Sequence, residues 1–235
     1  MTDRAVMLVT GTSRGIGLGI AEYFVERGYT VCGCSRSAGT LDSPHYRHTV
    51  LDVADEPAVR AWIAAVARDL GRIDVAVCNA GIVGSSLMLS VTPTKTWDEF
   101  ATTHMRGVFL VCREVSKVMV RQRGGRIVNL SSPAVAWHMP GAAAYAATKA
   151  GIEEMTRVLA AELAPAGVTC NVVRPGLVLT GTARALGGDR AASMLDRQTI
   201  RREVTIEEIC HVIEFFAAPA STAITGQTLS MCLIG

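Results

Sequence analysis

The chain has 235 residues, 49% of them hydrophobic, and this apolar fraction excludes an intrinsically disordered protein while allowing a sizeable core. The 23 Lys and Arg nearly balance the 21 Asp and Glu, which excludes the strongly basic surface typical of nucleic-acid-binding proteins. No apolar stretch reaches the roughly 18 residues of a membrane span, and Gly11 interrupts the N-terminal apolar run, so we expect neither a membrane anchor nor a signal peptide.

Short β-branched runs alternate with longer helical patterns along the chain. The expected strands are Ala5–Val9, Thr30–Cys34, His48–Asp52, Ile73–Cys78, Arg126–Leu130, Thr169–Val173 and Gln227–Cys232. The expected helices are Ile16–Arg27, Glu56–Leu70, Trp97–Arg123, Ala142–Leu163 and Ile206–Phe216. The strand cores are almost continuously apolar, which is typical of parallel strands covered on both faces. The pattern therefore predicts a single α/β domain over residues 1–235, a doubly wound parallel sheet of about seven strands flanked by helices.

Residues 181–202 are rich in Gly, Ala and Arg, with Gly187 and Gly188 near the centre. We expect this segment to form a mobile flap between two elements rather than an interdomain linker. Ligands of such sheets bind beyond the carboxyl ends of the strands, so the residues that follow each strand are the candidate site.

The first expected strand runs directly into a glycine-rich segment, Thr10 to Gly17, and then into an amphipathic helix. Glycines here let the backbone turn tightly and approach a pyrophosphate, and the helix N-terminus offers free N–H groups to phosphates. An ordinary tight turn is the alternative, but the position after the first strand favours a nucleotide site. The candidate cofactor-binding residues of this segment are Gly11, Ser13, Arg14, Gly15, Ile16 and Gly17.

The second expected strand is followed by Ser35 and Arg36, where a cofactor with free ribose hydroxyls would favour Asp or Glu. Arg36, joined by Arg14, would instead form charge-assisted hydrogen bonds to a 2′-phosphate. Two solvated surface arginines are the alternative. The pair favours NADP(H) over NAD(H) as the cofactor.

Two further strand ends extend the nucleotide site. Asp52 and Val53 would bracket an adenine, with the carboxylate accepting from the adenine amino group. Asn79, Ala80 and Gly81 follow the fourth strand, where small residues allow a nucleotide to lie close to the backbone.

Tyr145 and Lys149 lie about one helical turn apart near the start of an expected helix, so their side chains project from the same face. Ser132 follows the fifth expected strand and can converge with them. A cationic Lys149 would favour the phenolate and lower the pKa of Tyr145 toward the working pH, while Ser132 would hold the substrate oxygen. A surface contact is the alternative interpretation of a Tyr–Lys pair at this spacing.

Five segments together make the chain similar to the short-chain dehydrogenase/reductase family over nearly its whole length. They are TGTSRGIG at 10–17, NAG at 79–81, the serine at 132, YAATK at 145–149 and RPGLVLT at 174–180. Within the family the chain is most similar to the 3-oxoacyl-carrier-protein reductase type and to the polyketide ketoreductases. The resemblance implies a Rossmann-like fold, an NADP(H)-dependent ketone reduction and a homo-oligomer, either a tetramer or a dimer. The tail at 228–235 lacks the acidic or amide residue and the Gly-Gly with which family members often end.

The resemblance assigns roles to the matching residues. Tyr145 would donate the proton in ketone reduction, Lys149 would bind the nicotinamide ribose, and Ser132 would polarise the carbonyl. Ser131 lies one residue farther from Tyr145 and is the less favoured serine. The residues expected to contact the nicotinamide are Pro175, Gly176, Val178 and Thr180.

His104 stands where the family usually has a catalytic asparagine, in a helix that precedes Gly107, Val108 and Phe109. That asparagine helps to hold a water that connects Lys149 to solvent. A histidine would bond the same water and titrate near neutrality. Alternatively, His104 only packs in the helix and the relay is rearranged, and the sequence favours neither alternative.

Three segments should surround the substrate: residues 82–96, 133–144 and 177–197. Their side chains are mostly apolar, which favours an acyl-chain ketone over a sugar or a polyanion. The candidate substrate-binding residues are Ser132, Trp137, Met139, Leu177 and Met194.

A substrate presented by an acyl carrier protein would need a basic patch beside the entrance. Arg121, Arg123 and Arg126 would supply one, although arginines are also favourable at a solvated helix C-terminus.

The seven cysteines show no CxxC pair and no zinc-ligand spacing, and most lie in apolar runs. Buried thiols in a reducing cytoplasm fit better than disulfides, a catalytic cysteine or a metal site. We therefore expect a cytoplasmic protein without a metal.

The sequence leaves three functional hypotheses. The favoured one is an NADPH-dependent ketoreductase acting on a 3-oxoacyl or polyketide-type thioester. The second is an NADP-linked alcohol dehydrogenase or reductase of a free small ketone. The third is a catalytically weak nucleotide-binding protein, which the joint presence of Ser132, Tyr145 and Lys149 disfavours.

Overall fold

The computed structural model describes residues 4–83, 87–178 and 188–233. Within this part, seven parallel strands form one sheet in the order β3-β2-β1-β4-β5-β6-β7. The strands are β1 (Val6–Thr10), β2 (Thr30–Ser35), β3 (Tyr46–Val50), β4 (Val75–Cys78), β5 (Gly125–Leu130), β6 (Val168–Arg174) and β7 (Thr228–Ser230). The expected doubly wound parallel sheet of seven strands is thereby confirmed.

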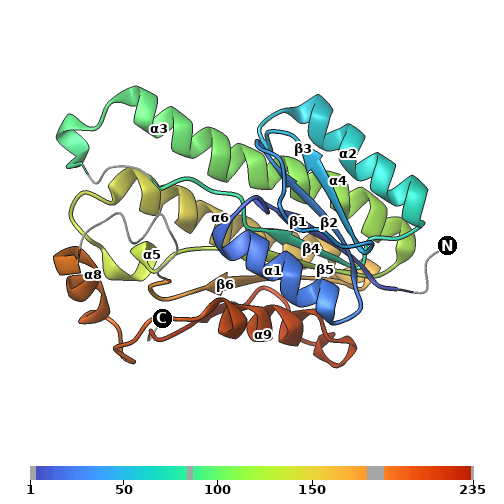
Figure 1. Cartoon of the computed structure of the whole chain (residues 1–235). Helices are drawn as coiled ribbons and strands as arrows, with labels where there is room; N and C mark the ends of the chain where they lie inside the picture. Colours follow the sequence, from blue (N-terminus) through green and yellow to red (C-terminus); the bar gives the residue numbers. More distant parts are fainter. Residues whose placement is uncertain (1–3, 84–86, 179–187, 234–235) are drawn as a thin grey trace.

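Helices cover both faces of the sheet (Figure 1). The longer ones are α1 (Gly15–Glu26), α2 (Glu56–Leu70), α4 (Gly107–Gln122), α6 (Ala143–Leu163) and α9 (Ile206–Ala217). The shorter ones are α3 (Thr94–Phe100), α5 (Ala134–Trp137) and α8 (Gly188–Leu195), with the single turns η1 (Leu89–Val91), η3 (Ala164–Ala166) and η4 (Pro219–Ser221). Helices α2, α4 and α6 lie on one face, and α1 and α9 lie on the other.

Two apolar cores follow from this arrangement, one on each face of the sheet. The first packs α2, α4 and α6 against the sheet through residues such as Val59, Ile63, Val111, Val115 and Ile152. The second packs α1 and α9 against the opposite face through Ile20, Phe24, Ile209, Ile213 and Phe216. Because β1, β4 and β6 are buried along their whole length, their sequences read as continuous apolar runs.

Cap residues define two of the predicted helix starts. The Asp55 side chain accepts a hydrogen bond from Ala58 N at 3.0 Å, one residue before α2 begins. Thr205 and Glu208 form a reciprocal capping box at the start of α9. Such caps satisfy N–H groups that have no partner inside the helix, so the expected starts at 56 and 206 are confirmed.

The third strand and the third helix differ from the sequence prediction. The third strand spans Tyr46–Val50 rather than His48–Asp52, because it lies at the sheet edge, where its partly exposed residues give a weak apolar signal. The helix expected at Trp97–Arg123 is a longer helical run in three parts. A π turn, η2 (Ala101–Arg106), joins α3 to α4 and rotates the residues after it relative to those before.

The segment expected to form a flap, 181–202, contains helix α8. The helix over Gly188–Leu195 was missed because two consecutive glycines, Gly187 and Gly188, suggested a break in the sequence. Residues 179–187 lie outside the described part of the chain.

The first turn of α1 can hold only glycine at position 17. A Cβ there would overlap the Gly11 carbonyl oxygen and Asn79 Nδ2. By contrast, a Cβ at Gly124, between α4 and β5, would meet no heavy atom within 4 Å.

We therefore predict that Gly17→Ala lowers the free energy of unfolding by about 1–3 kcal/mol, because the backbone of the turn must move. Gly124→Ala is the matched control and should change it by less than about 0.5 kcal/mol. Urea unfolding of both variants measures the difference. Equal stability of the two variants would show that the turn tolerates a side chain.

Candidate active site

The carboxyl ends of β1 and β4 are tied together by one residue, Thr10. Its Oγ1 accepts hydrogen bonds from Asn79 N at 3.0 Å and Ala80 N at 2.9 Å. Asn79 Nδ2 also donates to Thr10 O at 2.9 Å. The strand order reverses between β1 and β4, and a crevice at such a switch point is where ligands of doubly wound sheets bind. The sequence analysis did not select Thr10, although it is the last residue of β1.

The glycine turn lies at this switch point. Gly11 has φ +79°, a backbone conformation that favours glycine, and its N donates to Cys34 O at 2.7 Å. Helix α1 begins at Gly15, carries no acidic residue in its first turn and has no side-chain cap. Its first N–H groups can therefore donate hydrogen bonds to an anion, which fits a nucleotide phosphate. Ser13 and Ile16 are half-buried in the same turn, and Arg14 is exposed.

The loop after β2 carries Arg36, which is exposed, beside the half-buried Ser35. Ser35 Oγ donates to Ser37 O at 2.7 Å, and His48 Nε2 also contacts Ser37 O, at 2.9 Å. His48 on β3 therefore holds the loop after β2 through its contact with Ser37 O. The sequence analysis missed this role because His48 is distant from the loop along the chain.

Asp52 and Val53, which are expected to bracket an adenine, have different environments in the structure. Asp52 is exposed, and its Oδ1 accepts from Ala54 N at 2.9 Å, closing a turn after β3. Val53 is 7% exposed and packs beside Gly107. Gly81 is exposed next to the half-buried Asn79 and Ala80.

The side chains of Ser132 and Tyr145 lie near each other. Ser132 follows β5 and is 7% exposed, and its Oγ accepts from Ala134 N at 3.3 Å. Tyr145 is in the first turn of α6, and Ser132 is near enough to act on its pKa. Two hydroxyls this close can both reach one substrate oxygen. Ser131, in contrast, uses its hydroxyl to donate to Glu153 Oε1 at 2.5 Å.

Lys149 lies one turn after Tyr145 and is 5% exposed. Its Nζ donates to Leu130 O at 3.1 Å and lies 6.0 Å from the centroid of the Tyr145 ring. Burial lowers the pKa of Lys149 from 10.5 to about 8, because water no longer solvates the charged form. The ammonium is thus held between the end of β5 and the tyrosine.

The expected lowering of the Tyr145 pKa is wrong for this structure. Burial raises the pKa of Tyr145 above its ordinary value of 10.0, and the hydrogen bond from Ser132, which lowers it, is the smaller effect. Desolvation penalises the phenolate more than the nearby groups stabilise it. Tyr145 therefore remains a neutral phenol at neutral pH.

Both ring nitrogens of His104 are occupied by the protein. Ile82 N donates to His104 Nε2 at 3.0 Å. Thr148 Oγ1 donates its one hydrogen to Tyr145 O at 2.8 Å, so in the 3.0 Å contact between Nδ1 and Thr148 Oγ1 the ring nitrogen is the donor. The ring is therefore neutral and has a single tautomer, protonated on Nδ1. Burial, followed by the positive charge of Lys149, lowers the pKa of His104 from 6.5 to about 3.

The His104 ring is also packed between two aromatic rings. It is fully buried, stacks on Phe100 at a centroid distance of 5.6 Å and meets Tyr145 edge to face at 5.4 Å. These contacts fit the alternative in which His104 packs in the helix. The alternative of titration near neutrality does not fit a pKa of about 3.

The segment after β6 is buried and held by a side chain that the sequence analysis missed. Pro175 and Gly176 are buried, and Val178 is half-buried. Gln198, 2% exposed, accepts from Leu177 N and donates to Ile200 O and Arg202 O. Gln198 thereby links this segment to the chain after α8. Thr180, the remaining residue expected near the nicotinamide, lies outside the described residues.

The expected substrate residues occupy different environments. Trp137 ends α5 and Met139 follows it, both half-buried, and Met194 is half-buried on α8. Leu177 is 7% exposed, more buried than the other three.

Arg121, Arg123 and Arg126 do not flank the site, which fits the alternative of a solvated helix C-terminus rather than a basic patch at the entrance. They lie at the end of α4 and the start of β5, whereas Ser132 follows the other end of β5. Six residues of β-strand span about 20 Å. The three arginines are therefore at the amino edge of the sheet, opposite the candidate site.

The described residues contain no group of three or more His, Cys, Asp or Glu side chains that could hold a metal ion. All seven cysteines are free, and six of them are buried, as the sequence predicts. In the same part of the chain, no helix is both long and apolar enough to cross a membrane.

Comparison with known proteins agrees with this geometry. A family model described as "Enoyl-(Acyl carrier protein) reductase" matches residues 11–232. The 3-oxoacyl-[acyl-carrier-protein] reductase FabG of Vibrio harveyi is 34% identical over 230 residues, which are 95% of this chain and 94% of that protein.

Two solved structures share the fold and sequence similarity. An actinorhodin polyketide ketoreductase variant with NADPH has a TM-score of 0.88 at 30% identity and covers 98% of this chain and 96% of its own. An NAD+-bound xylitol dehydrogenase has a TM-score of 0.88 at 28% identity, covering 97% of both chains. The chain belongs to the short-chain dehydrogenase/reductase family of oxidoreductases.

Proposed function

We propose that this enzyme reduces the ketone of a 3-oxoacyl or polyketide-type thioester to a secondary alcohol, with NADPH as the hydride donor. The observation that carries the proposal is the convergence of Ser132, Tyr145 and Lys149 at the carboxyl edge of the sheet. The FabG of Vibrio harveyi and the NADPH-bound ketoreductase, both similar to this chain, support the substrate class.

In the proposed mechanism, Ser132 and Tyr145 hold the carbonyl oxygen. NADPH, when bound, supplies the hydride that adds to the carbonyl carbon. The Tyr145 hydroxyl donates its proton to the oxygen, and Ser132 donates a hydrogen bond that stabilises the developing negative charge. A raised pKa suits Tyr145 to this role, because the group must be protonated before it can act as an acid.

Lys149 would stabilise the phenolate that Tyr145 leaves behind. With a pKa of about 8 it is largely cationic at neutral pH, and its Nζ is close to the tyrosine ring. It would also bind the nicotinamide ribose.

The cofactor would extend across the switch point. The glycine turn from Gly11 to Gly17 would hold the pyrophosphate, and Arg14 and Arg36 would bind the 2′-phosphate. Asp52, Val53 and the segment at 79–81 would surround the adenosine, and residues 175–180 would contact the nicotinamide. Similar structures bind NADPH or NAD+, so the preference for NADP(H) depends on the two arginines.

We assign His104 a positioning role. It contacts Tyr145 through its ring and, through the Thr148 hydroxyl, through the Tyr145 backbone. A neutral ring whose two nitrogens are both hydrogen bonded within the protein holds the tyrosine in place and does not relay a proton.

An NADP-linked reductase of a free small ketone is the alternative. The location of Arg121, Arg123 and Arg126 favours it, because arginines at the amino edge of the sheet cannot guide a carrier protein to the site. We also propose that the protein forms a homo-oligomer and that residues 181–202 act as a substrate flap. Exposed apolar residues on α4 and α6, such as Phe109 and Val158, suit an interface.

The first prediction from the proposed function concerns catalysis. NADPH oxidation with a 3-oxoacyl thioester should fall about 10²- to 10⁴-fold in Tyr145→Phe, because the proton donor is lost. Tyr23→Phe, which loses only a hydrogen bond to Glu214 between α1 and α9, is the matched control and should retain activity. Unchanged turnover in Tyr145→Phe would contradict the mechanism. Equal kcat/KM for free and carrier-bound thioesters would favour the free-ketone alternative.

The second prediction concerns the cofactor. Arg36→Asp should raise the KM for NADPH about 10- to 100-fold while leaving that for NADH within a few-fold, because a charged hydrogen bond is worth about 1.5–3 kcal/mol. Arg60→Asp makes the same charge change on an exposed residue of α2 and should alter neither KM. A similar rise in both variants would indicate only a general electrostatic effect.

The third prediction concerns His104 and pH. Its pKa of about 3 in the folded chain lies below the 6.5 of the unfolded chain, so unfolding takes up a proton between these values. Its contribution to stability is full above pH 6.5 and decreases as the pH falls. Between pH 7 and pH 5 the free energy of unfolding should fall by about 2 kcal/mol on this account.

His104→Asn should remove this part of the pH dependence, while the exposed His211→Asn should retain it. Urea unfolding at pH 5, 6 and 7 compares the three proteins. The same slope in the parent and in His104→Asn would refute a neutral, buried His104.

A further inference from the structure

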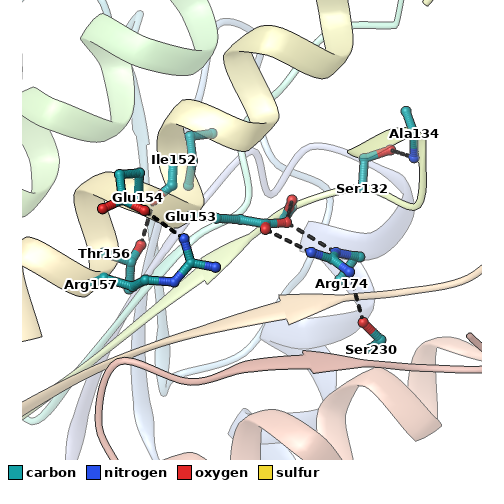
Figure 2. A network of polar contacts seen from close by, with 10 residues as sticks. Ser132, Ala134, Ile152, Glu153, Glu154, Thr156, Arg157, Arg174 and Ser230 are labelled. Carbon is teal, nitrogen blue, oxygen red and sulfur yellow. Dashed lines mark hydrogen bonds and ion pairs between the residues drawn. The ribbon is translucent and has the colours of Figure 1, made fainter. Parts of the chain in front are cut away.

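A buried ion pair joins α6 to the end of β6 behind the candidate active site. Arg174 Nη2 lies 2.7 Å from Glu153 Oε2, and Arg174 Nε donates to Glu153 Oε1 at 3.0 Å. The side chains are only 10% and 4% exposed. Figure 2 shows the two side chains meeting end to end between the helix and the strand. Such a bidentate pair fixes the relative direction of both groups.

Two serines complete the hydrogen bonding of the pair. Ser131 Oγ donates to Glu153 Oε1 at 2.5 Å, and Arg174 Nη1 donates to Ser230 Oγ at 3.0 Å on β7. The network thus connects the end of β5, helix α6, β6 and β7.

Three members of the network are close along the chain to residues of the proposed mechanism. Ser131 precedes Ser132, Arg174 precedes Pro175, and Glu153 is one helical turn after Lys149. Backbone hydrogen bonds reinforce these links, since Ser131 N donates to Val173 O and Met231 N donates to Arg174 O, both at 2.9 Å. Displacement of the pair would therefore move both Ser132 and the Pro175 segment.

Stability alone does not account for this pair. Desolvation of two charges offsets much of their attraction, and an apolar pair of similar volume is often equally stable. Apolar side chains, however, would not fix the position of the Ser131 hydroxyl or of the Arg174 backbone. We infer that Glu153 and Arg174 are positioning residues, which hold Ser132 and the Pro175-Gly176 segment in register with Tyr145 and Lys149. The inference rests on the proposed function for the roles of these residues.

Single substitutions of the pair would not test this role, because the remaining buried charge would itself destabilise the fold. Two other variants separate positioning from folding. Ser131→Ala removes only the link toward Ser132 and leaves the ion pair intact. The double variant Glu153→Met/Arg174→Met removes both charges together.

Helix α6 also provides a matched control. Glu154 Oε2 and Arg157 Nη1 form an ion pair at 2.6 Å, but their side chains are 69% and 48% exposed (Figure 2). The control variant is Glu154→Met/Arg157→Met. Thermal unfolding of every variant is measured beside kcat, the KM for NADPH and NADPH affinity by nicotinamide fluorescence.

Ser131→Ala should lower kcat about tenfold and leave the KM for NADPH unchanged, because it releases only Ser132. The buried double variant should lower kcat at least as much and also weaken NADPH binding several-fold, since it releases Pro175 as well. The control should match the parent in every measurement. A purely structural role would lower stability but would not lower kcat while leaving the KM for NADPH unchanged.

Folded Ser131→Ala and buried double variants with the parental kcat and NADPH affinity would overturn the inference. Should the double variant fail to fold, kcat of Ser131→Ala decides alone. A parent that binds NADPH but reduces no ketone would overturn the proposed function instead. NADPH affinity of the buried double variant relative to the control would then still decide whether the pair positions Pro175.

Discussion

All seven strands of the sheet run in the same direction, and the location of every functional side chain depends on this constraint. Parallel neighbours require crossover connections, so each strand ends at the same edge of the sheet. The glycine turn after β1, the segment at 79–81 after β4, Ser132 after β5 and Pro175 after β6 are thereby gathered from distant parts of the sequence. Thr10 then joins the two halves of the sheet where the strand order reverses.

Burial has the same electrostatic effect on three side chains of the site. It raises the pKa of Tyr145 and lowers those of Lys149 and His104, in each case because the charged form loses its water. The outcomes differ in chemistry. Tyr145 stays protonated and can act as an acid, Lys149 remains largely cationic at neutral pH, and His104 is held neutral well below it. The site therefore combines one neutral phenol, one cation and one neutral imidazole ring.

The features that local sequence patterns predict are the sheet, the main helices and the site segments. Continuous apolar runs indicate buried strands, and cap residues such as Asp55 and Thr205 indicate where helices begin. The features that were missed depend on contacts between distant residues. Glu153 and Arg174 are 21 residues apart, and Gln198 reaches Leu177 over the same separation. Neither pairing has a local sequence signal.

Two further outcomes have a plain physical cause. Arg121 and Arg123 precede β5 and Arg126 is at its start, and residues at the start of a parallel strand lie at the amino edge, away from the ligand site. The pKa of Tyr145 was misjudged because the attraction of Lys149 was considered without the desolvation of the phenol. Sequence spacing indicates which groups can meet, but burial decides which protonation state they take.

The C-terminal strand connects these observations. Strand β7 is short, and the tail after it is apolar, unlike the tail often found in the family. Its backbone is nevertheless well used: Met231 N donates to Arg174 O, and Cys232 O accepts from Thr199 N, both at 2.9 Å. Ser230 in addition accepts from the Arg174 side chain. The tail thus links the buried ion pair to the chain after α8, where Gln198 holds Leu177. One continuous set of hydrogen bonds therefore runs from residues 230–232 to Ser131, and a shift of these residues would be transmitted to the residue that precedes Ser132.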